Sequence, residues 1–523
     1  MHCVIGSGPA GVACAQALLA QGADVLMLDA GIELEPPQAQ TVRELAAKKF
    51  SEWKPAQLAA VRGDIAATAK GIPLKTLFGS DFPYRETEEK IPWRGNGIGF
   101  RPSLALGGLS NVWGAAMLPY RDDDIQDWPI KVSDLAPHYR AVAGITGLAG
   151  QPDDLAESFP LYCDRPDPLQ LSRQADRFLR RLERHREKLR ARGWRFGRSR
   201  LAVRGAASPR GAGCVYCGQC MTGCVYGCIF NAADTVRELK RDARFRYQSD
   251  VIVTRLREDA GKVSIEGFHR QTGAPLAFEA PRVYLAAGVI PTAQILLRSQ
   301  DAFDRPLTLR DSQYFLFPIL RARGAGDVRR EPLHTLSQAF VELNNRQVSR
   351  HTVHLQVYSY SDIIGHAIRG SLGPFKLFAR PFAERLLIVQ GYLHSDASST
   401  IDMTLKRDGA KDVLQLDAKP NPQTVPTIRK VLKELSGRAI ALGGIPLPPL
   451  LQIADPGRGY HTGGSLPMRK EPQPFESDVL GRPHGWKRLH LVDASVLPSV
   501  PATTITFSVM ANAHRIGSRT ADL

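Results

Sequence analysis

Five of the eight cysteines lie in one short segment, residues 214–228. They follow the spacing C-x2-C-x2-C-x3-C, and a fifth cysteine comes after three further residues: Cys214, Cys217, Cys220, Cys224 and Cys228. The first four reproduce the ferredoxin pattern for a 4Fe–4S cluster, except that Val225 replaces the customary proline. Zinc is a second possibility, although zinc sites more often combine two separated C-x2-C pairs. Metal-free thiols, kept reduced in the cytoplasm, are a third. The spacing does not decide which four of the five would bind a metal.

A second chemical motif opens the chain. The sequence G-S-G-P-A-G at residues 6–11 follows a short apolar strand, residues 2–5. It precedes an Ala- and Leu-rich helix, residues 12–21, and a second buried strand that ends at Asp29. This order of strand, G-x-G-x-x-G turn, helix, strand and acid is that of a dinucleotide-binding unit.

The three glycines and the acid of this motif each have a physical role in binding a dinucleotide. Gly6 permits the tight turn, and Gly8 lets the backbone approach a pyrophosphate. Gly11 lets the helix pack closely on the strand, so that the positive N-terminus of the helix faces the phosphates. Asp29 can accept hydrogen bonds from the adenosine ribose.

Later parts of the chain favour FAD over NAD as the dinucleotide. Residues 105–114 form a second glycine-rich turn, and residues 283–288 form a buried strand that runs into a turn before a helix at 292–299. Near the C-terminus, residues 490–498 contain another strand ending at an acid, and a final helix is expected from about residue 506. In this order the pieces resemble the glucose–methanol–choline (GMC) family of FAD-dependent oxidoreductases.

The resemblance implies a set of FAD-binding residues. The glycine-rich turn would line the flavin and its pyrophosphate, Asp493 and Ala494 would meet the ribityl and phosphate region, and Val251 would contact adenine. The candidate cofactor-binding residues are Gly6, Gly8, Gly11, Asp29, Gly107, Gly108, Ser110, Asn111, Val251, Ala287, Asp493 and Ala494. The N-terminus of the last helix would point at the pyrimidine edge of the flavin and stabilise the charge of its reduced form.

Residues 461–468 are similar to the family's H-x-x-G-x-x-x-M block, which carries the active-site histidine. On this resemblance His461 accepts the substrate hydroxyl proton as general base while a hydride passes to flavin N5. Imidazole suits this role because its ordinary pKa lies near neutral pH. The alternative is a structural histidine with satisfied hydrogen bonds.

The family usually supplies a second histidine or asparagine eleven residues after the aspartate near the C-terminus. Counting from Asp493 leads to Thr504, which can bind a substrate oxygen but is no base at neutral pH. Either His461 works with Thr504 as a positioning group, or the reaction differs from alcohol oxidation. Asn512 and His514 lie too far along the final helix to replace the missing group.

The expected fold class is α/β: a Rossmann-like FAD-binding domain with an inserted α+β antiparallel-sheet substrate domain. Residues 1–310 and 456–523 are assigned to the discontinuous FAD-binding domain, which includes the cysteine segment, residues 211–231. Residues 311–455 are assigned to the substrate-binding domain, which in the family is a sheet that covers the flavin.

The predicted substrate domain contains antiparallel strands and one apolar segment. Alternating apolar and polar residues predict antiparallel strands with one solvated face at 351–360, 385–394, 400–405 and 413–416. The apolar segment 363–382 could form a hydrophobic lid, a membrane-surface contact or a packed pair of helices.

Composition narrows the function further. The 523 residues are 43% hydrophobic and 23% charged, which is typical of a soluble globular protein and excludes a disordered or fibrous chain. The net charge of +16 is densest at residues 173–204, which predict an amphipathic helix whose basic face is either solvated or contacts an anionic partner. No nucleic-acid motif, targeting segment or long apolar stretch is present, so a cytoplasmic protein without a transmembrane helix is expected.

Three hypotheses follow. The first is a FAD-dependent dehydrogenase that oxidises a CH–OH group of a sugar, polyol or other alcohol. In one branch of the family a comparable cysteine stretch holds an iron–sulfur cluster, and electrons would then leave through it to an acceptor protein. The second, motivated by Thr504, is a flavin-dependent lyase, desaturase or redox-neutral enzyme. The third is a basic binding protein that retains an inert flavin fold.

Overall fold

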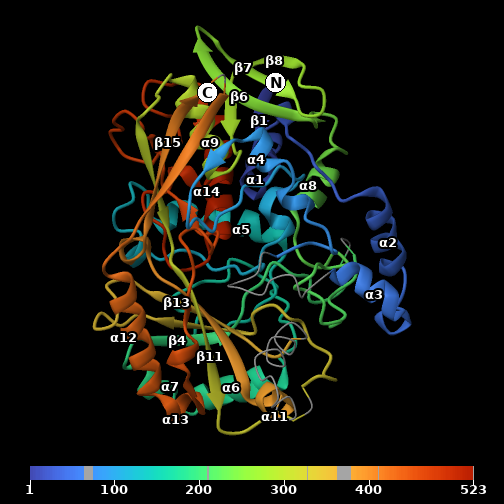
Figure 1. Ribbon diagram of the computed structural model, residues 1–523, viewed down its shortest axis with the longest axis vertical. Helices are drawn as coiled ribbons and strands as arrows, with labels where there is room; N and C mark the ends of the chain where they lie inside the picture. Colours follow the sequence, from blue (N-terminus) through green and yellow to red (C-terminus); the bar gives the residue numbers. More distant parts are fainter. Residues whose placement is uncertain (64–74, 209–210, 327, 362–378, 410, 522–523) are drawn as a thin grey trace.

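The computed structural model describes residues 1–63, 75–208, 211–326, 328–361, 379–409 and 411–521 (Figure 1). The molecule is elongated, and the two termini lie at the same end, beside β1. A parallel sheet and its helices occupy this half, whereas a larger antiparallel sheet with helices α6, α7, α12 and α13 occupies the other half.

The parallel sheet forms where the sequence has short, continuously apolar strands, as expected for strands buried on both faces. Its strand order is β20-β9-β1-β2-β5. The strands are β1 (His2–Ile5), β2 (Val25–Leu28), β5 (Phe245–Gln248), β9 (Val283–Leu285) and β20 (Leu489–Leu491). Its associated helices are α1 (Pro9–Ala20), α8 (Ala232–Leu239), α9 (Val289–Ser299) and α14 (Ile505–Thr520). The arrangement is consistent with the predicted Rossmann-like domain.

Helix α1 packs directly against the turn that follows β1 because two glycines allow it. Gly6 has φ +101°, and a Cβ atom there would lie 2.5 Å from the carbonyl oxygen of Ala286. A Cβ atom on Gly11 would lie 2.0 Å from the carbonyl oxygen of Gly6. The close approach of helix to strand therefore requires glycine at both positions.

Two smaller sheets flank this half. An antiparallel sheet is formed by β6 (Val251–Asp259), β7 (Lys262–His269) and β8 (Pro275–Ala280). A five-stranded sheet has the order β19-β10-β15-β16-β3. Its strands are β3 (Trp93–Arg94), β10 (Pro306–Asp311), β15 (Thr400–Asp408), β16 (Lys411–Lys419) and β19 (Thr462–Gly463).

The large antiparallel sheet has the order β17-β11-β14-β13-β12-β4, and β18 pairs with β11. Its strands are β4 (Trp194–Arg198), β11 (Tyr314–Arg321), β12 (Ala339–Leu343), β13 (Val353–Tyr358), β14 (Leu386–Tyr392), β17 (Gly444–Pro446) and β18 (Gln452–Ile453). Odd-numbered side chains of β11 to β14 form a second apolar core with α6 (Arg173–Glu183), α12 (Thr424–Ser436) and α13 (Ala439–Leu442). Even-numbered side chains therefore lie on the opposite face, toward the parallel sheet.

The remaining helices connect these layers: α2 (Pro36–Ala46), α3 (Pro55–Arg62), α4 (Thr87–Lys90), α5 (Val132–Thr146), α7 (Arg186–Arg190) and α11 (Ala379–Arg385). Two elements lie across the domain boundaries expected from the sequence. Strand β4 joins the large sheet of the 311–455 segment, and β15 pairs with β10 on the other side of residue 311. The division at residues 310 and 455 itself stays a prediction.

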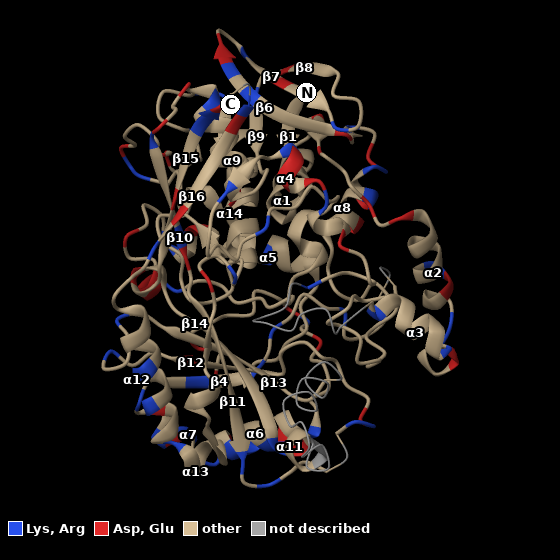
Figure 2. Cartoon of the chain, in the orientation of Figure 1, with Lys and Arg blue, Asp and Glu red and all other residues tan. Residues whose placement is uncertain are grey.

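The basic segment 173–204 is not one helix, as the sequence suggested. It forms α6, α7 and then β4, because Gly193 turns the chain at φ +79° and Trp194 and Phe196 alternate into the core of the large sheet. Figure 2 shows basic residues on α12 and at the end of the molecule where α6 lies. Several are paired: the Arg190 guanidinium is 2.6 Å from the Asp154 carboxylate.

The apolar segment 363–382 lies outside the described residues up to position 378, and its last residues belong to α11. Within the ranges that the structure describes, no helix is long and apolar enough to cross a membrane.

The contact between β1 and α1 predicts a stability effect. Gly11→Ala places a methyl group against the carbonyl oxygen of Gly6, and overpacking of this kind costs about 1–3 kcal/mol. We expect the free energy of unfolding, measured by denaturant titration, to fall by that amount. The matched control is Gly144→Ala in α5, where nothing lies within 4 Å of the added atom and alanine favours the helix. Equal stability of Gly11→Ala and wild type would contradict the packing described.

Candidate functional site

Three adjoining cavities run along the carboxyl ends of the parallel strands. Cavity A has a volume of about 70 Å³ and is lined by Val251 and its neighbours on β6. Cavity B, about 180 Å³, shares Gly6, Asp29 and Ala287 with cavity A. Cavity C, about 300 Å³, shares Pro9, Leu109, Tyr460, Ile505 and Thr506 with cavity B. Together they form one path from β6 to the large antiparallel sheet.

Most of the residues expected to bind a dinucleotide line this path. Cavity B is lined by Gly6, Gly8, Asp29, Gly108, Ala287, Asp493 and Ala494. Cavity C is lined by Ser110, His461 and Thr504. Three expected residues lie elsewhere. Gly11 packs α1 on β1, a Cβ atom on Gly107 would meet the backbone of α8 at 2.6 Å, and Asn111 lines a different cavity.

Three helices begin at cavity B. The first residues of α1, α9 and α14 (Pro9, Val289 and Ile505) all line it. None of the three helices has a side-chain hydrogen bond at its N-cap. Their first N–H groups and the positive ends of their dipoles therefore favour an anion in cavity B.

Two buried carboxylates fix the turns around cavity B. Asp29 accepts hydrogen bonds from the Ser7 amide (3.1 Å), the Ser7 hydroxyl (2.7 Å) and the Tyr247 hydroxyl. Burial raises the pKa of Asp29 to about 6. Asp493 accepts from the Gly288 amide (2.9 Å) and the Thr292 hydroxyl (2.6 Å), and burial raises its pKa as well. Each carboxylate thus ties one glycine-containing turn to the strand beside it.

The backbone around cavity B leaves room for a bulky anion. A Cβ atom on Gly8 would have no neighbour within 4 Å, and the same holds for Gly288. Bare backbone at the start of two uncapped helices is a suitable environment for a pyrophosphate. The residues present therefore fit the dinucleotide that the sequence predicts.

His461 lies at the boundary of cavity C, directly before β19. Its ring stacks on the ring of Tyr392, with centroids 4.7 Å apart. Its Nδ1 atom is buried and has no hydrogen-bond partner among the described residues. Burial, with a smaller effect of His354, lowers the pKa of His461 to about 3. The imidazole is therefore neutral at pH 7 and can accept a proton.

Thr504 is buried at the start of α14, and its hydroxyl oxygen accepts a hydrogen bond from the Leu118 amide (2.8 Å). Because this bond uses only an acceptor site, the O–H can still donate to an oxygen in cavity C, whereas a hydroxyl group is no base at neutral pH.

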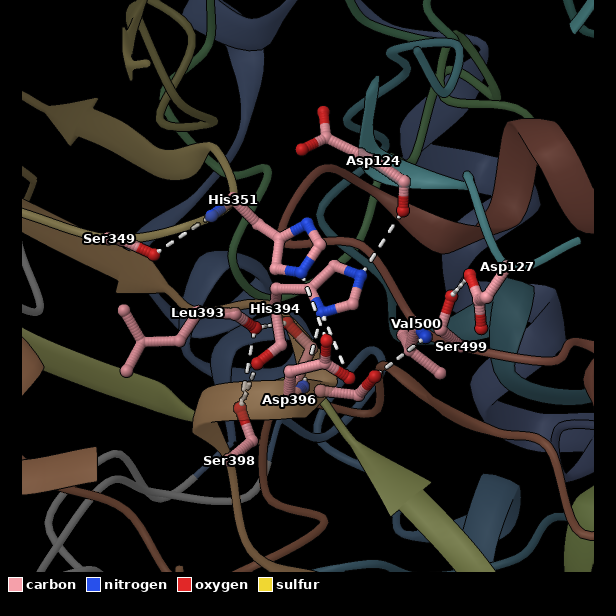
Figure 3. A network of polar contacts seen from close by, with 12 residues as sticks. Asp124, Asp127, Ser349, His351, Leu393, His394, Asp396, Ser398, Ser499 and Val500 are labelled. Carbon is pink, nitrogen blue, oxygen red and sulfur yellow. Dashed lines mark hydrogen bonds and ion pairs between the residues drawn. The ribbon is translucent and has the colours of Figure 1, made fainter. Parts of the chain in front are cut away.

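The loop before Thr504 is tied to the end of β14 by a polar network (Figure 3). The Ser499 hydroxyl donates to Asp127 (2.8 Å), and the Val500 amide donates to the Ser395 hydroxyl (3.0 Å). The His394 Nε2 atom lies 3.2 Å from the backbone oxygen of Asp124. These bonds fix the position of Thr504 relative to the large sheet.

His351, His394 and Asp396 in this network are the one group among the described residues whose nitrogen and oxygen atoms approach closely enough for a metal. The atoms that face one another are already hydrogen-bonded within the group or to the backbone. The His351 Nε2 atom is 3.0 Å from the Asp396 carboxylate, and the His394 Nδ1 atom accepts the Asp396 amide (3.1 Å). Both nitrogens of His394 are engaged, one with the backbone oxygen of Asp124 and one with the amide of Asp396, so the histidine connects these two segments.

The large sheet, which the resemblance expected to cover the flavin, supplies a wall of cavity C whose residues the sequence did not identify. The wall contains Tyr314, Gln356, Tyr358, Gln390 and Tyr392. The polar face of these strands was expected to be solvated, but it is buried against cavity C. The alternation V-H-L-Q-V-Y at residues 353–358 carries the signal, since a solvated face would more often bear charged residues than amides and tyrosines.

Lys75 is a further residue that the sequence analysis missed. It lines both cavity C and a fourth cavity, D, of about 590 Å³. Its ammonium group donates to the backbone oxygen of Trp113 (2.9 Å), and burial lowers its pKa to about 8. Lys75 is thus a cation whose charge changes near neutral pH.

The cysteine segment lies beside cavity D, which is lined by Cys220 and Cys224. All five of its thiols are free of disulfides. No three of their sulfur atoms lie within 4.8 Å of one another in the described chain, whereas Zn–S bonds of about 2.3 Å bring the sulfurs of one zinc site closer than that. A preformed zinc site is therefore not supported. Hydrogen bonds from the Cys228 thiol and amide lower the pKa of Cys224 below its usual range.

Comparisons with known proteins agree with this geometry. Residues 451–513 match the family model described as GMC oxidoreductase. The fold is similar to that of pyridoxine 4-oxidase from Mesorbium loti, with a TM-score of 0.61 and 15% identity over 100% of this chain and 99% of the other. It is also similar to formate oxidase, with a TM-score of 0.61 and 14% identity over 99% and 97% of the two chains. A search of curated protein sequences found no significant match.

These findings support an oxidoreductase enzyme with the overall fold of the two solved structures. The matched segment includes His461, Asp493 and Thr504, which is the part of the expected family resemblance that is confirmed. Nothing in the comparisons supports the iron–sulfur branch of the family.

Gly8→Ala separates cofactor binding from folding. The added methyl group meets no protein atom within 4 Å, and the φ of −64° at this position suits alanine, so stability should not change. The methyl group projects toward cavity B, and we expect the affinity for FAD to fall about tenfold or more. Fluorescence titration of apoprotein with FAD measures this, with Gly144→Ala as the control. Unchanged FAD affinity would place the pyrophosphate elsewhere.

Proposed function

We propose that this protein is a FAD-dependent oxidoreductase that oxidises a CH–OH group of a small-molecule alcohol, sugar or polyol. The continuous path of cavities A, B and C, with His461 at its end, carries this proposal. The family match over the segment that contains His461 and the overall fold support it.

The cofactor would occupy the path in a defined direction. Val251 and its neighbours would hold the adenine in cavity A, and Asp29 would bind the ribose. Gly8 and the uncapped helix ends would bind the pyrophosphate in cavity B, near Asp493 and Ala494. Bound FAD would supply the acceptor for a hydride at flavin N5.

His461 would act as the general base. It is neutral at pH 7 and lines cavity C, where the substrate hydroxyl would lie. The proton of that hydroxyl passes to the imidazole as the carbinol hydrogen leaves as hydride. The Thr504 hydroxyl donates to the same substrate oxygen and positions it, and the Lys75 ammonium stabilises its developing negative charge.

The threonine at position 504 motivates one alternative to alcohol oxidation. No second histidine or asparagine occupies this position, so the residue pair that usually serves alcohol oxidation is incomplete. In the alternative, a flavin-dependent lyase, desaturase or redox-neutral enzyme would use the same cavities without net alcohol oxidation. A lyase or redox-neutral enzyme would convert its substrate without lasting reduction of the flavin, whereas a desaturase would reduce the flavin but form a C=C bond instead of a carbonyl group.

The route of the electrons after flavin reduction is a separate proposal. The two structural neighbours are named oxidases, which favours molecular oxygen as the acceptor. An iron–sulfur cluster at the cysteine segment, with an acceptor protein, predicts about four iron and four acid-labile sulfide atoms per chain after anaerobic purification. Their absence leaves metal-free thiols beside cavity D.

An anaerobic screen tests the proposal. The purified protein is mixed with sugars, polyols and simple alcohols, and the absorbance of its flavin is followed. Oxidation of a CH–OH group predicts bleaching by at least one compound and formation of the carbonyl product. Conversion of a substrate without bleaching supports the redox-neutral alternative, and a protein that binds no flavin contradicts both.

His461→Gln should slow flavin reduction about 10²- to 10⁴-fold while the FAD content stays at the wild-type level, because only the base is removed. Stopped-flow absorbance measures the rate. The matched control is His490→Gln, a buried histidine on β20 that lines none of the cavities A to C and should leave the rate unchanged. A wild-type rate in His461→Gln removes the histidine from the mechanism.

The pH dependence of kcat/KM follows from two pKa values. His461 stays neutral above about pH 4, so no loss of activity is expected between pH 7 and pH 5 from this group. Lys75 loses its charge above about pH 8, so kcat/KM should fall there, and Lys75→Met should remove that limb. An acidic limb with a pKa near the ordinary histidine value would contradict the burial of His461.

A further inference from the structure

The side chains in the wall of cavity C lie in rows, because the register of four antiparallel strands pairs their residues directly. One row crosses the sheet through directly paired residues on β11, β14, β13 and β12: Tyr314, Tyr392, His354 and Glu342. The next row places Gln390 and Gln356 directly opposite each other on β14 and β13. Both glutamines line cavity C, whereas Glu342 and His354, in the adjacent row on the same face, are not among its lining residues.

A chain of hydrogen bonds connects the two rows. The Tyr358 hydroxyl donates to the Gln356 Oε1 atom (2.9 Å), and the Gln356 Nε2 atom lies 3.0 Å from the His354 Nε2 atom. An amide nitrogen can only donate, so the His354 Nε2 atom must be the unprotonated one.

The proton of the imidazole is therefore on the His354 Nδ1 atom. That atom is 2.6 Å from the Glu342 carboxylate and donates to it. The tautomer of His354 is thus set by Glu342, and it sets in turn which end of the Gln356 amide faces the imidazole.

The burial of this pair needs an explanation. Glu342 is 1% exposed and His354 is fully buried, and the second carboxylate oxygen of Glu342 has no partner among the described residues. Apolar residues of similar size would be an equally or more stable choice at these two buried positions. The pair therefore contributes something other than stability, and its one polar connection toward cavity C is Gln356.

We propose that the Glu342–His354 pair is a positioning device that locks the Gln356 amide, so that Gln356 and Gln390 form a binding subsite for neighbouring hydroxyl groups of the substrate. This inference rests on the proposed function of cavity C. The second N–H of Gln356 is left to donate to a substrate oxygen, and Gln390 on the adjacent strand serves the next oxygen. The stacked rings of Tyr314 and Tyr392, 5.2 Å apart, lie beside the amides.

Two amides on directly paired positions of neighbouring strands, with tyrosines beside them, suit a ring that carries adjacent hydroxyl groups. The substrate class is therefore a sugar or cyclic polyol rather than an alcohol with a single hydroxyl. Loss of the lock would let His354 take the other tautomer and Gln356 rotate its amide. The carbonyl oxygen of Gln356, an acceptor, would then face the substrate in place of its N–H donor.

A double-mutant cycle tests the lock, with D-glucose and myo-inositol as the probes and flavin absorbance as the readout of binding to the holoenzyme. Glu342→Leu should raise the Kd of the bound probe about tenfold, because it removes the acceptor of the His354 Nδ1–H bond, and a misdirected Gln356 amide leaves a buried partner unsatisfied. In the Gln356→Leu background the same change should have no further effect on the Kd, since on this proposal Glu342 reaches the bound probe through Gln356. Additive effects would overturn the positioning role.

The matched control is Glu434→Leu on α12. Glu434 accepts the indole N–H of Trp194 (3.1 Å) on the opposite face of the same sheet, so its loss perturbs the sheet without touching cavity C. We expect the control to leave the Kd of the probe unchanged. Binding of neither probe, together with oxidation of an alcohol that has one hydroxyl, would overturn the substrate class.

Histidine ¹⁵N NMR of the holoenzyme provides a readout that needs no substrate. We expect the His354 ring to be protonated at Nδ1, and Glu342→Leu, which removes the acceptor of that proton, to change the tautomer. A wild-type ring protonated at Nε2 or at both nitrogens would overturn the lock. If the NMR result is as expected but no alcohol reduces the flavin, the proposed function fails and the lock stands.

Discussion

The convergence of three uncapped helix N-termini on cavity B is the constraint on which the rest of the structure depends. Helices α1 and α14 pack side by side, and a Cβ atom on Gly517 would be 3.0 Å from Ala17. Both helices start at cavity B and run away from it, so their positive ends lie next to each other. This arrangement is unfavourable unless an anion lies between the ends, and a pyrophosphate satisfies that condition.

The segment between β19 and α14 connects this anion site to the reaction chemistry. His461 precedes β19, which pairs with β10, and Asp493 holds the turn that begins α9. Thr504 precedes α14 and is fixed to the large sheet through the loop at residues 499–500. On the proposed function, a single stretch of chain would therefore supply the base, a cofactor turn and a positioning hydroxyl, and it lies within the segment that matches the family model.

Local patterns in the sequence predicted the parts of the site that depend on backbone geometry. The spacing of Gly6, Gly8 and Gly11 specifies a strand, a turn and a helix within twenty residues, and the structure has them. Val251, Asp493 and Ala494 could be assigned only by resemblance, because their approach to cavities A and B joins segments that are far apart in the chain.

Contacts between distant segments determine three features that the sequence did not predict: the burial of one strand face, the strand at Trp194 and Phe196, and the arrangement of the cysteine sulfur atoms. Alternation at 353–358 predicted a strand, but a face of His354, Gln356 and Tyr358 has the same period whether it meets water or a cavity. Trp194 and Phe196 were assigned to a helix, although they pair across the sheet with β12. The cysteine spacing fits several centres, and only the arrangement of the sulfur atoms shows that a preformed zinc site is not supported.

The most direct test of this account is a crystal structure of the protein as purified. We predict FAD along the three cavities, with adenine beside Val251, the pyrophosphate at the first turn of α1 and the flavin ring between His461 and the start of α14. A protein without flavin, or a flavin ring outside cavity C, would contradict the central claim.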